Sequence, residues 1–340
     1  MRIELPISKS IANRLLILQA IHGDGLMTVS CDMPDDVRIM SEAIRRLGER
    51  REARIDLGNC GTAMRFLTAY CAQLEGQTTI LDGVERMHHR PIAQLVDALR
   101  EIGADIEYLG EEGFPPLRIK GCILDKHRIV TINNPQSTQF VSALLLIGAN
   151  VQTDSTSPYI YITREVIKQY QLSPFSYHLS VEKDWSSAAF WYEYVALYGG
   201  EITLLGLSRD SLQGDKIVAD IFAHLGVRTT YTAEGVVISS SPLHPTPYTL
   251  HHDFSACPDL YPAIALTCER LGVELHATGV ESLPLKESDR LRAVREHRTD
   301  ADHRMAMALL IAGYEVDDTA CISKSYPNFI EHFRHINSLK

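Results

Sequence analysis

Basic residues and small polar residues recur together where helices are expected to begin. The segment Lys9-Ser10-Ile11-Ala12-Asn13-Arg14 sets two cations and a hydroxyl group about one helical turn apart, a spacing that suits a phosphate or a carboxylate. The turn Gly58-Asn59-Cys60-Gly61 leads into Thr62-Ala63-Met64-Arg65, and its glycines let the backbone approach an anion closely. Arg86 and Arg90 stand just before a further helix. These segments predict binding of small anionic molecules.

The second half of the chain adds cations that stand beside carboxylates. They occur in Lys286-Glu287-Ser288-Asp289-Arg290 and in Asp302-His303-Arg304-Met305, and Lys324 follows. If the substrate is anionic, we expect its site to be a local basic cluster in an acidic protein, because the whole chain carries a net charge of −10. That net charge also argues against nucleic acid or an anionic membrane as a partner.

Six helices are expected to begin alike, with a small polar or acidic residue ahead of an apolar run. Hydroxyl and carboxylate side chains at such positions can cap backbone N–H groups. A cap alone is common and signifies only stability, whereas several helix starts around one cleft would attract phosphates and carboxylates. The six expected starts are Ser10, Thr62, Ser137, Ser186, Asp259 and Asp302.

These six helices are apolar on nearly every face, so they are expected inside a domain. Helices with one polar face lie between them, and three glycines are expected to end such helices in the left-handed conformation, namely Gly48, Gly103 and Gly226. A unit of strands, a buried helix and an amphipathic helix that occurs six times predicts a repeat architecture with three units per lobe.

A chain of 340 residues favours two domains of ordinary size. We expect one lobe over residues 8–213 and the other over residues 214–340, with residues 1–7 joining the second lobe. The seven cysteines are widely spaced and never form Cys-x-x-Cys, which indicates reduced thiols in the cytosol. The N-terminal segment lacks the features of a signal peptide, and the apolar stretch 141–151 is too short to span a bilayer. We therefore expect a cytoplasmic protein.

Two histidine pairs, His88-His89 and His251-His252, contain residue types that bind metals. Neither pair has a third ligand at a metal-binding spacing, so exposed surface histidines are the better interpretation and no metal site is predicted. Cys60 and Cys257 lie beside candidate site residues, and a small buried filler is the better interpretation of each.

Six motifs together resemble the 5-enolpyruvylshikimate-3-phosphate synthase family. They are Ser-Lys-Ser-x-x-Asn-Arg, Gly-Asn-x-Gly-Thr-Ala-Met-Arg, Arg-Met-x-x-Arg-Pro-Ile, Ser-(Ser/Thr)-Gln-Phe, Lys-Glu-(Ser/Thr)-Asp-Arg and Asp-His-Arg-Met-Ala-Met, in order from residue 8 to about residue 330. Each motif alone is weakly specific, but six in order at repeat spacing are very specific. Compared with that family, the chain is shorter by several tens of residues.

The resemblance implies a fold and a reaction. The fold would be an α/β fold with two lobes, each an inside-out α/β barrel of three repeated strand-helix units. The reaction would transfer the enolpyruvyl group of phosphoenolpyruvate to the 5-hydroxyl of shikimate 3-phosphate, releasing phosphate through a tetrahedral intermediate, as part of the shikimate pathway. It calls for no metal or organic cofactor, and we expect a monomer.

The resemblance also implies a role for each matching position. Lys9, Asp259, Lys286 and Glu287 would be catalytic, with Asp259 and Lys286 at the 5-hydroxyl and Glu287 as proton donor to the methylene carbon. Shikimate 3-phosphate would contact Lys9, Ser10, Arg14, Ser137, Thr138, Gln139, Thr156, Tyr159, Asp259, Ser282 and Lys286. Phosphoenolpyruvate would contact Lys9, Asn59, Gly61, Thr62, Arg86, Gln139, Arg290, Arg304 and Lys324.

Charge balance agrees with these implied roles. Two phosphates and two carboxylates bring roughly −5 to −6 charges. Seven cations would face them, namely Lys9, Arg14, Arg86, Lys286, Arg290, Arg304 and Lys324.

Two other interpretations remain open. The related enolpyruvyl transferase that acts on UDP-N-acetylglucosamine usually has Asn after its first lysine, whereas this chain has Ser10. A catalytically dead binding homologue would explain the short length, but Asp259, Glu287, Arg290 and Lys324 are all retained.

Overall fold

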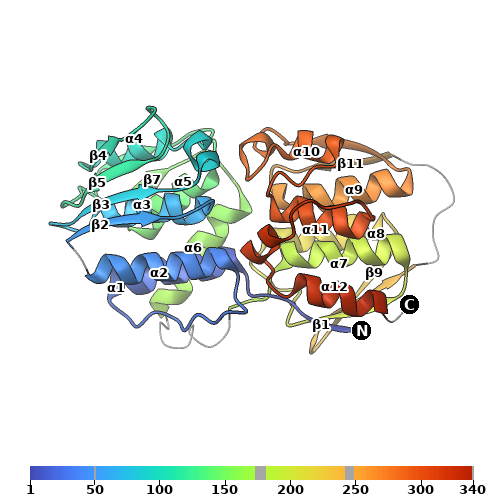
Figure 1. The fold of residues 1–340 in the computed structure, drawn as a ribbon. Coiled ribbons are helices and arrows are strands. Elements are labelled where there is room, and N and C mark those ends of the chain that lie inside the picture. The colour runs from blue at the N-terminus through green and yellow to red at the C-terminus, as the bar shows by residue number, and fades with distance from the viewer. Residues whose placement is uncertain (50, 173–180, 242–248, 339–340) are drawn as a thin grey trace. The chain divides into compact units, whose positions relative to one another are not determined.

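The computed structural model describes residues 1–49, 51–172, 181–241 and 249–338. The chain forms two compact units (Figure 1). The N-terminal unit comprises Lys9–Cys31 and Asp36–Val181, and the C-terminal unit comprises Met1–Ser8, Asp32–Asp35 and Glu182–Lys340. The division near residue 181 differs from the expected one at residue 213.

Residues 182–213 belong to the C-terminal unit because α7 (Trp185–Tyr198) is buried there. Trp191 of α7 donates from Nε1 to the hydroxyl of Tyr326 at 3.2 Å, and Phe190 packs edge-on against Phe329. Both partners lie near the end of the chain, so α7 could not be moved to the other unit without exposing this aromatic core.

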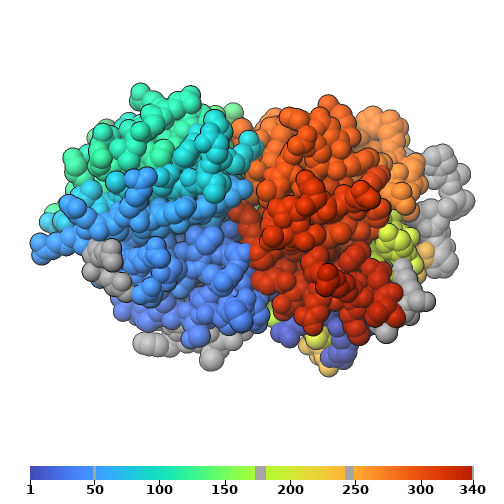
Figure 2. Space-filling view, in the orientation of Figure 1, coloured from blue at the N-terminus to red at the C-terminus, as the bar shows by residue number. Residues whose placement is uncertain are grey.

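Each unit holds three apolar helices that pack on one another, as the sequence predicts. Residues 185–195 of α7, for example, are buried without a break. The space-filling view shows the outer face of the atoms that cover such helices (Figure 2). The helices are α1 (Lys9–His22), α3 (Gly61–Ala72) and α5 (Thr138–Leu146) in the N-terminal unit, and α7, α9 (Tyr261–Leu271) and α11 (His303–Ala312) in the C-terminal unit.

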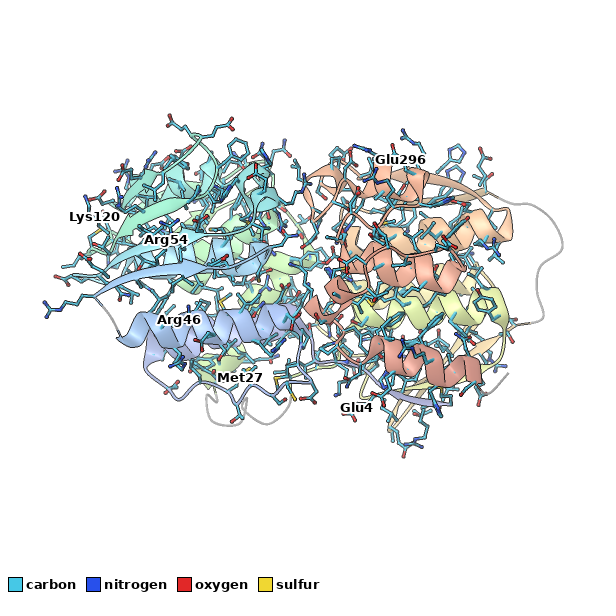
Figure 3. The ribbon with its side chains drawn as sticks, in the orientation of Figure 1. Glu4, Met27, Arg46, Arg54, Lys120 and Glu296 are labelled. Atoms are coloured by element: carbon cyan, nitrogen blue, oxygen red, sulfur yellow. The ribbon has the colours of Figure 1, made fainter. Side chains whose placement is uncertain are left out.

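Helices with a polar face alternate with the buried ones along the chain. In α2, Arg46 pairs with Glu42 at 2.8 Å on the exposed face (Figure 3), while Val37 and Met40 are fully buried on the other. The alternating helices are α2 (Asp35–Glu49), α4 (Ala93–Glu101), α6 (Pro158–Leu172), α8 (Val218–Ala223), α10 (Arg290–Glu296) and α12 (Phe329–Ser338).

The two units contain sheets of matching topology. In the four-stranded sheets β2-β3-β5-β4 and β1-β8-β10-β9, the first pair is parallel and the others are antiparallel, and each unit adds a parallel pair, β6-β7 or β11-β12. The N-terminal unit has β2 (Glu52–Asp56), β3 (Thr78–Asp82), β4 (Asp105–Tyr108), β5 (Leu117–Lys120), β6 (Ile129–Thr131) and β7 (Asn150–Gln152). The C-terminal unit has β1 (Arg2–Glu4), β8 (Glu201–Leu205), β9 (Val227–Thr232), β10 (Gly235–Ser240), β11 (Thr249–Asp253) and β12 (Glu274–Thr278).

Across the described residues none of these sheets closes into a barrel, so the structure shows a mixed α/β fold. Within those residues, no helix is both long enough and apolar enough to cross a membrane. The described part of the chain also contains no group of three or more metal-ligating side chains.

Two of the six expected caps are confirmed. Ser137 accepts a hydrogen bond from the backbone N–H of Gln139, and Asp302 accepts one from that of Arg304. Ser186 was the wrong residue, because Asp184 caps α7. The remaining three positions lie inside helical turns: Ser10 in α1, Thr62 in α3 and Asp259 in the 3-10 turn η4 (Pro258–Leu260).

Of the three glycines that were expected to end helices in the left-handed conformation, two have a positive φ angle and one does not. Gly103 and Gly226 have the positive φ angles of left-handed residues, 102° and 83°. Gly48 instead lies inside α2, which continues to Glu49.

Candidate functional site

The start of α1 carries an ion pair. Nζ of Lys9 lies 2.8 Å from Oδ2 of Asp36, in the first turn of α2, and both side chains are largely buried. Asp36 was not among the predicted site residues. Its carboxylate holds the ammonium group of Lys9 in place and offsets its charge.

Four of the five N–H groups of Arg14 donate to protein acceptors. Its Nε donates to Oγ1 of Thr163 at 2.7 Å, Nη1 to the carbonyl of Ser10 at 2.7 Å, and Nη2 to Oγ of Ser142 and the carbonyl of Tyr159. The side chain is only 2% exposed. Burial lowers the pKa of Arg14 to about 10, so the group stays charged at neutral pH. The structure thus gives Arg14 the role of joining α1, α5 and α6.

The start of α3 is covered by Arg90. Gly61 is the first residue of α3, and a Cβ atom there would lie 2.5 Å from Nη1 of Arg90. Nη1 also approaches the carbonyl of Asn59 at 3.4 Å. A helix N-terminus with a buried guanidinium against it favours anions. Arg90 was noted in the sequence as a neighbour of Arg86 but was not predicted as a site residue.

A hydrogen-bond chain links α3 to α5. Nη1 of Arg65 donates to Oε1 of Gln139 at 2.8 Å, and Nε2 of Gln139 donates to Oγ1 of Thr62 at 2.8 Å. The predicted residues Thr62 and Gln139 therefore lie together although they are far apart in the sequence. Arg65, which connects them, was missed as a site residue because its motif position shows only that it lies in a helix.

Other predicted residues of the N-terminal unit lie in turns. Arg86 is partly buried in the 3-10 turn η1 (Glu85–His89), which a 2.9 Å contact between His88 and Asp82 holds against β3. Ser137 and Thr138 form the start of α5. Thr156 is exposed in the turn before α6.

The C-terminal unit gathers six predicted residues into one cluster of charges. Oδ1 of Asp259 accepts hydrogen bonds from Nη1 of Arg290 at 2.8 Å and from Nζ of Lys286 at 3.4 Å, and Oδ2 accepts one from Nη2 of Arg304 at 2.9 Å. Burial opposes ionisation of Asp259, but the charges of Arg304, Lys286 and Arg290 outweigh it and hold its pKa well below the usual value. Asp259 is therefore an ionised hydrogen-bond acceptor.

Glu287 and Lys324 complete this cluster. Oε2 of Glu287 accepts from Nη2 of Arg290 at 3.1 Å, and Oε1 lies 3.8 Å from Nζ of Lys324, in the 3-10 turn η6 (Ala320–Lys324). Burial lowers the pKa of Lys286, and the negative charge of Asp259 opposes that effect. Ser282, which precedes the 3-10 turn η5 (Leu283–Leu285), is partly buried at its start.

Two carboxylates of this cluster were not predicted as site residues. Asp302 accepts from Nε of Arg290 at 2.8 Å. Asp215, in the 3-10 turn η3 (Gly214–Ile217), accepts from the hydroxyl of Ser186. Burial, and next the charge of Asp259, raise the pKa of Asp215 to about 7. The sequence showed both only as residues at helix starts, and nothing local indicates that they face Arg290 or Asp259.

The cations of the C-terminal unit are thus matched by carboxylates of the same unit. Asp215, Asp259, Glu287 and Asp302 stand against Lys286, Arg290, Arg304 and Lys324. The charge count made from the sequence took only the cations, so it overstated the positive charge that is free to bind an anion. An anionic ligand at these guanidinium groups would therefore meet cations whose charge the carboxylates already offset in part.

Comparison with known proteins gives concordant results. The family described as EPSP synthase (3-phosphoshikimate 1-carboxyvinyltransferase) matches residues 49–172, 146–297 and 294–333. A 3-phosphoshikimate 1-carboxyvinyltransferase of Bacteroides fragilis is 38% identical over 394 aligned positions, which cover 98% of this chain and 94% of the relative. A 3-phosphoshikimate 1-carboxyvinyltransferase of Cellvibrio japonicus is 31% identical, and the alignment covers 99% of this chain and 96% of the relative.

The fold comparison agrees. A solved EPSP synthase of Acinetobacter baumannii matches with a TM-score of 0.68 at 19% identity, over 98% of this chain and 95% of that one. The alignment with the Bacteroides relative is 394 positions long although this chain has 340 residues. The relative therefore has residues at many positions where this chain has none, in agreement with the shortness noted in the sequence.

Proposed function

Because this chain belongs to the EPSP synthase (3-phosphoshikimate 1-carboxyvinyltransferase) family, we propose that its substrates are phosphoenolpyruvate and shikimate 3-phosphate. The reaction transfers the enolpyruvyl group to the 5-hydroxyl of shikimate 3-phosphate and releases phosphate. The observation that carries the proposal is the cluster of Asp259, Glu287, Arg290 and Lys324, which brings an acceptor, a carboxyl group and cations within hydrogen-bond or ion-pair distance of one another.

We assign the proton transfers and the stabilisation of phosphate in this reaction to residues of the same cluster. The 5-hydroxyl oxygen adds to C2 of phosphoenolpyruvate while the methylene carbon takes a proton, which we assign to Glu287. We assign the acceptance of the hydroxyl proton to Asp259, with Lys286 beside the same hydroxyl as a cation. The C2–O bond to phosphate then breaks as the methyl group loses a proton, and Arg290, Arg304 and Lys324 stabilise the departing phosphate.

Substrate binding would change the strength of Asp259 as a base. In this structure Arg304, Lys286 and Arg290 keep Asp259 ionised and weakly basic. If the anions of phosphoenolpyruvate draw Arg290 and Arg304 away, the pKa of Asp259 rises and the carboxylate becomes a better proton acceptor. Before phosphoenolpyruvate binds, these ion pairs therefore keep Asp259 a weak base.

The N-terminal unit would supply the remaining contacts. We assign shikimate 3-phosphate to Ser10, Arg14, Ser137, Thr138, Thr156 and Tyr159, with Ser282 of the other unit. We assign phosphoenolpyruvate to Asn59, Gly61, Thr62 and Arg86, with Lys9 and Gln139 between the two substrates. Four of the five N–H groups of Arg14 donate to protein atoms, so a substrate would take the fifth N–H group or replace a protein acceptor.

The architecture supports a further proposal about the fold. Buried and amphipathic helices alternate six times along the chain, and three buried helices pack together in each unit. The matching sheet topologies repeat this pattern. We interpret the units as two lobes of three strand-helix repeats each, in the arrangement of an inside-out α/β barrel. We further propose that the enzyme is cytoplasmic and acts as a monomer. Light scattering on the purified chain tests whether it is a monomer.

Phosphate release from phosphoenolpyruvate tests the activity. The purified chain is given phosphoenolpyruvate with shikimate 3-phosphate or with UDP-N-acetylglucosamine. Release with shikimate 3-phosphate alone supports the proposal. Release with the sugar nucleotide alone would assign the chain to the related transferase, and tight binding without release would identify a dead homologue.

A further inference from the structure

Arg65 lies behind the two side chains, Thr62 and Gln139, that the N-terminal unit would offer to phosphoenolpyruvate. It is 5% exposed. Its guanidinium carbon lies 5.4 Å from the ring centre of Phe140, and its Nη1 donates to Oε1 of Gln139. Arg65 contacts Gln139 directly and is linked to Thr62 through Gln139. It can therefore control the direction in which the hydrogen atoms of both side chains point.

The chemistry of the guanidinium fixes the direction of the chain of hydrogen bonds. Arginine has only donors, so the amide oxygen of Gln139 must face Arg65 and the amide nitrogen must face away. That nitrogen donates to Oγ1 of Thr62. With Oγ1 already accepting, the hydroxyl hydrogen of Thr62 is directed to another acceptor. Arg65 therefore leaves Thr62 and the second N–H of Gln139 as donors.

We infer that Arg65 is a positioning residue that makes Thr62 and Gln139 present hydrogen-bond donors to an anionic substrate. The inference rests on the proposed function. The two side chains lie in the first turns of α3 and α5. The N-terminus of a helix carries a partial positive charge, which also favours an anion. Without Arg65 the amide can turn over, and its oxygen would then face the anion.

A merely structural role for Arg65 makes a different prediction. Gln139→Glu keeps the contact with Arg65 and strengthens it to an ion pair, so a structural role would be preserved. The carboxylate cannot donate, however, and Thr62 would have to turn its hydroxyl hydrogen toward Glu. This variant reverses the direction of the hydrogen bonds without removing the partner of Arg65.

The experiment compares the full-length chain with Arg65→Met, Arg65→Lys and Gln139→Glu. Phosphoenolpyruvate binding is measured by calorimetry, and melting temperature and kinetics are measured on the same samples. Arg100→Met is the matched control, because Arg100 also stacks on a ring, that of Tyr108, and donates to the carbonyl of Ile106, but contacts neither Thr62 nor Gln139.

We expect Arg65→Met to weaken phosphoenolpyruvate binding and raise its KM about tenfold, with a smaller change in kcat. Arg65→Lys should recover part of this loss. Gln139→Glu should lose at least as much affinity while its melting temperature stays at or above that of the wild type. Arg100→Met should bind phosphoenolpyruvate as the wild type does.

Two results would overturn the inference: phosphoenolpyruvate affinity within twofold of wild type in Arg65→Met, or retained affinity in Gln139→Glu. Failure of the proposed function looks different. In that case the wild-type chain releases no phosphate from phosphoenolpyruvate and shikimate 3-phosphate, whereas the calorimetric comparison of the variants still decides the role of Arg65.

Discussion

Nε of Arg290 donates to Oδ2 of Asp302 over 2.8 Å, and neither side chain is more than 1% exposed. The same guanidinium also donates to Asp259 and Glu287. Burial alone would lower the pKa of Arg290, but the charges of Asp302, Asp259 and Glu287 outweigh this and raise it. Asp302 thus accepts from Nε and Nη2 of Arg290, while Asp259 accepts from Nη1 and Glu287 from Nη2.

Removing the charge of Asp302 should destabilise the C-terminal unit. Asp302→Asn keeps the cap of α11 but removes a negative charge beside the buried positive charge of Arg290. We therefore expect the free energy of unfolding to fall by about 3 kcal/mol. Urea denaturation measures it. The control is Glu296→Gln on α10, labelled in Figure 3, whose pair with Arg292 is exposed and should contribute less than about 0.5 kcal/mol. Equal losses in the two variants would contradict the special role of Asp302.

Glu287→Gln should separate binding from turnover. The amide keeps the size of the side chain and its contact with Arg290 but cannot deliver the proton, so we expect kcat to fall by about 100-fold or more while both substrates still bind. Calorimetry for each substrate and steady-state phosphate release supply the two readouts. Near-normal turnover would exclude Glu287 as the proton donor.

Gly61→Ala should weaken phosphoenolpyruvate binding without unfolding the chain. The new Cβ would stand 2.5 Å from Nη1 of Arg90, and this flexible side chain can move aside. Its movement takes a cation from the start of α3, and we expect the dissociation constant to rise about tenfold.

Gly48→Ala is the matched control for Gly61→Ala. A Cβ at Gly48 would meet nothing within 4 Å, and the residue lies inside α2. Alanine there should stabilise the fold by about 0.5–1 kcal/mol and leave binding unchanged. If both variants bind phosphoenolpyruvate like the wild type, Arg90 has no part in holding that substrate.

Asp215 should make stability depend on pH. Burial and the charge of Asp259 raise its pKa from 3.8 to about 7, so the folded chain holds this proton more tightly than the unfolded chain. The resulting stabilisation is present in full below about pH 4 and is lost as the pH rises through about 7. Asp215→Asn cannot titrate and should gain stability relative to the wild type as the pH rises from about 4 to about 7.

Urea denaturation at several pH values checks this expectation. The exposed Asp220 of α8 offers the control variant Asp220→Asn, which should follow the wild-type curve. A difference between Asp215→Asn and wild type that does not change with pH would show that Asp215 is already ionised in the folded chain.

Local sequence patterns were enough to predict the buried helices and the family, and the proposed contact residues stay predictions. A segment as rich in apolar residues as 185–195 indicates burial on every face wherever the helix docks. Motifs such as Lys286-Glu287-Ser288-Asp289-Arg290 likewise keep their residues within one or two turns of one another. Such information lies within a few neighbouring positions and does not depend on which distant segments meet.

The tertiary structure decided which charges are available. Asp302 and Asp215 reach Arg290 and Asp259 from other segments of the C-terminal unit, and Thr163 and Ser142 take up the donors of Arg14. Hydrogen bonds and ion pairs between such segments depend on packing over long sequence separations, whereas a residue type shows only what a side chain is able to do. Whether a cation is free for a substrate is therefore a property of the folded chain.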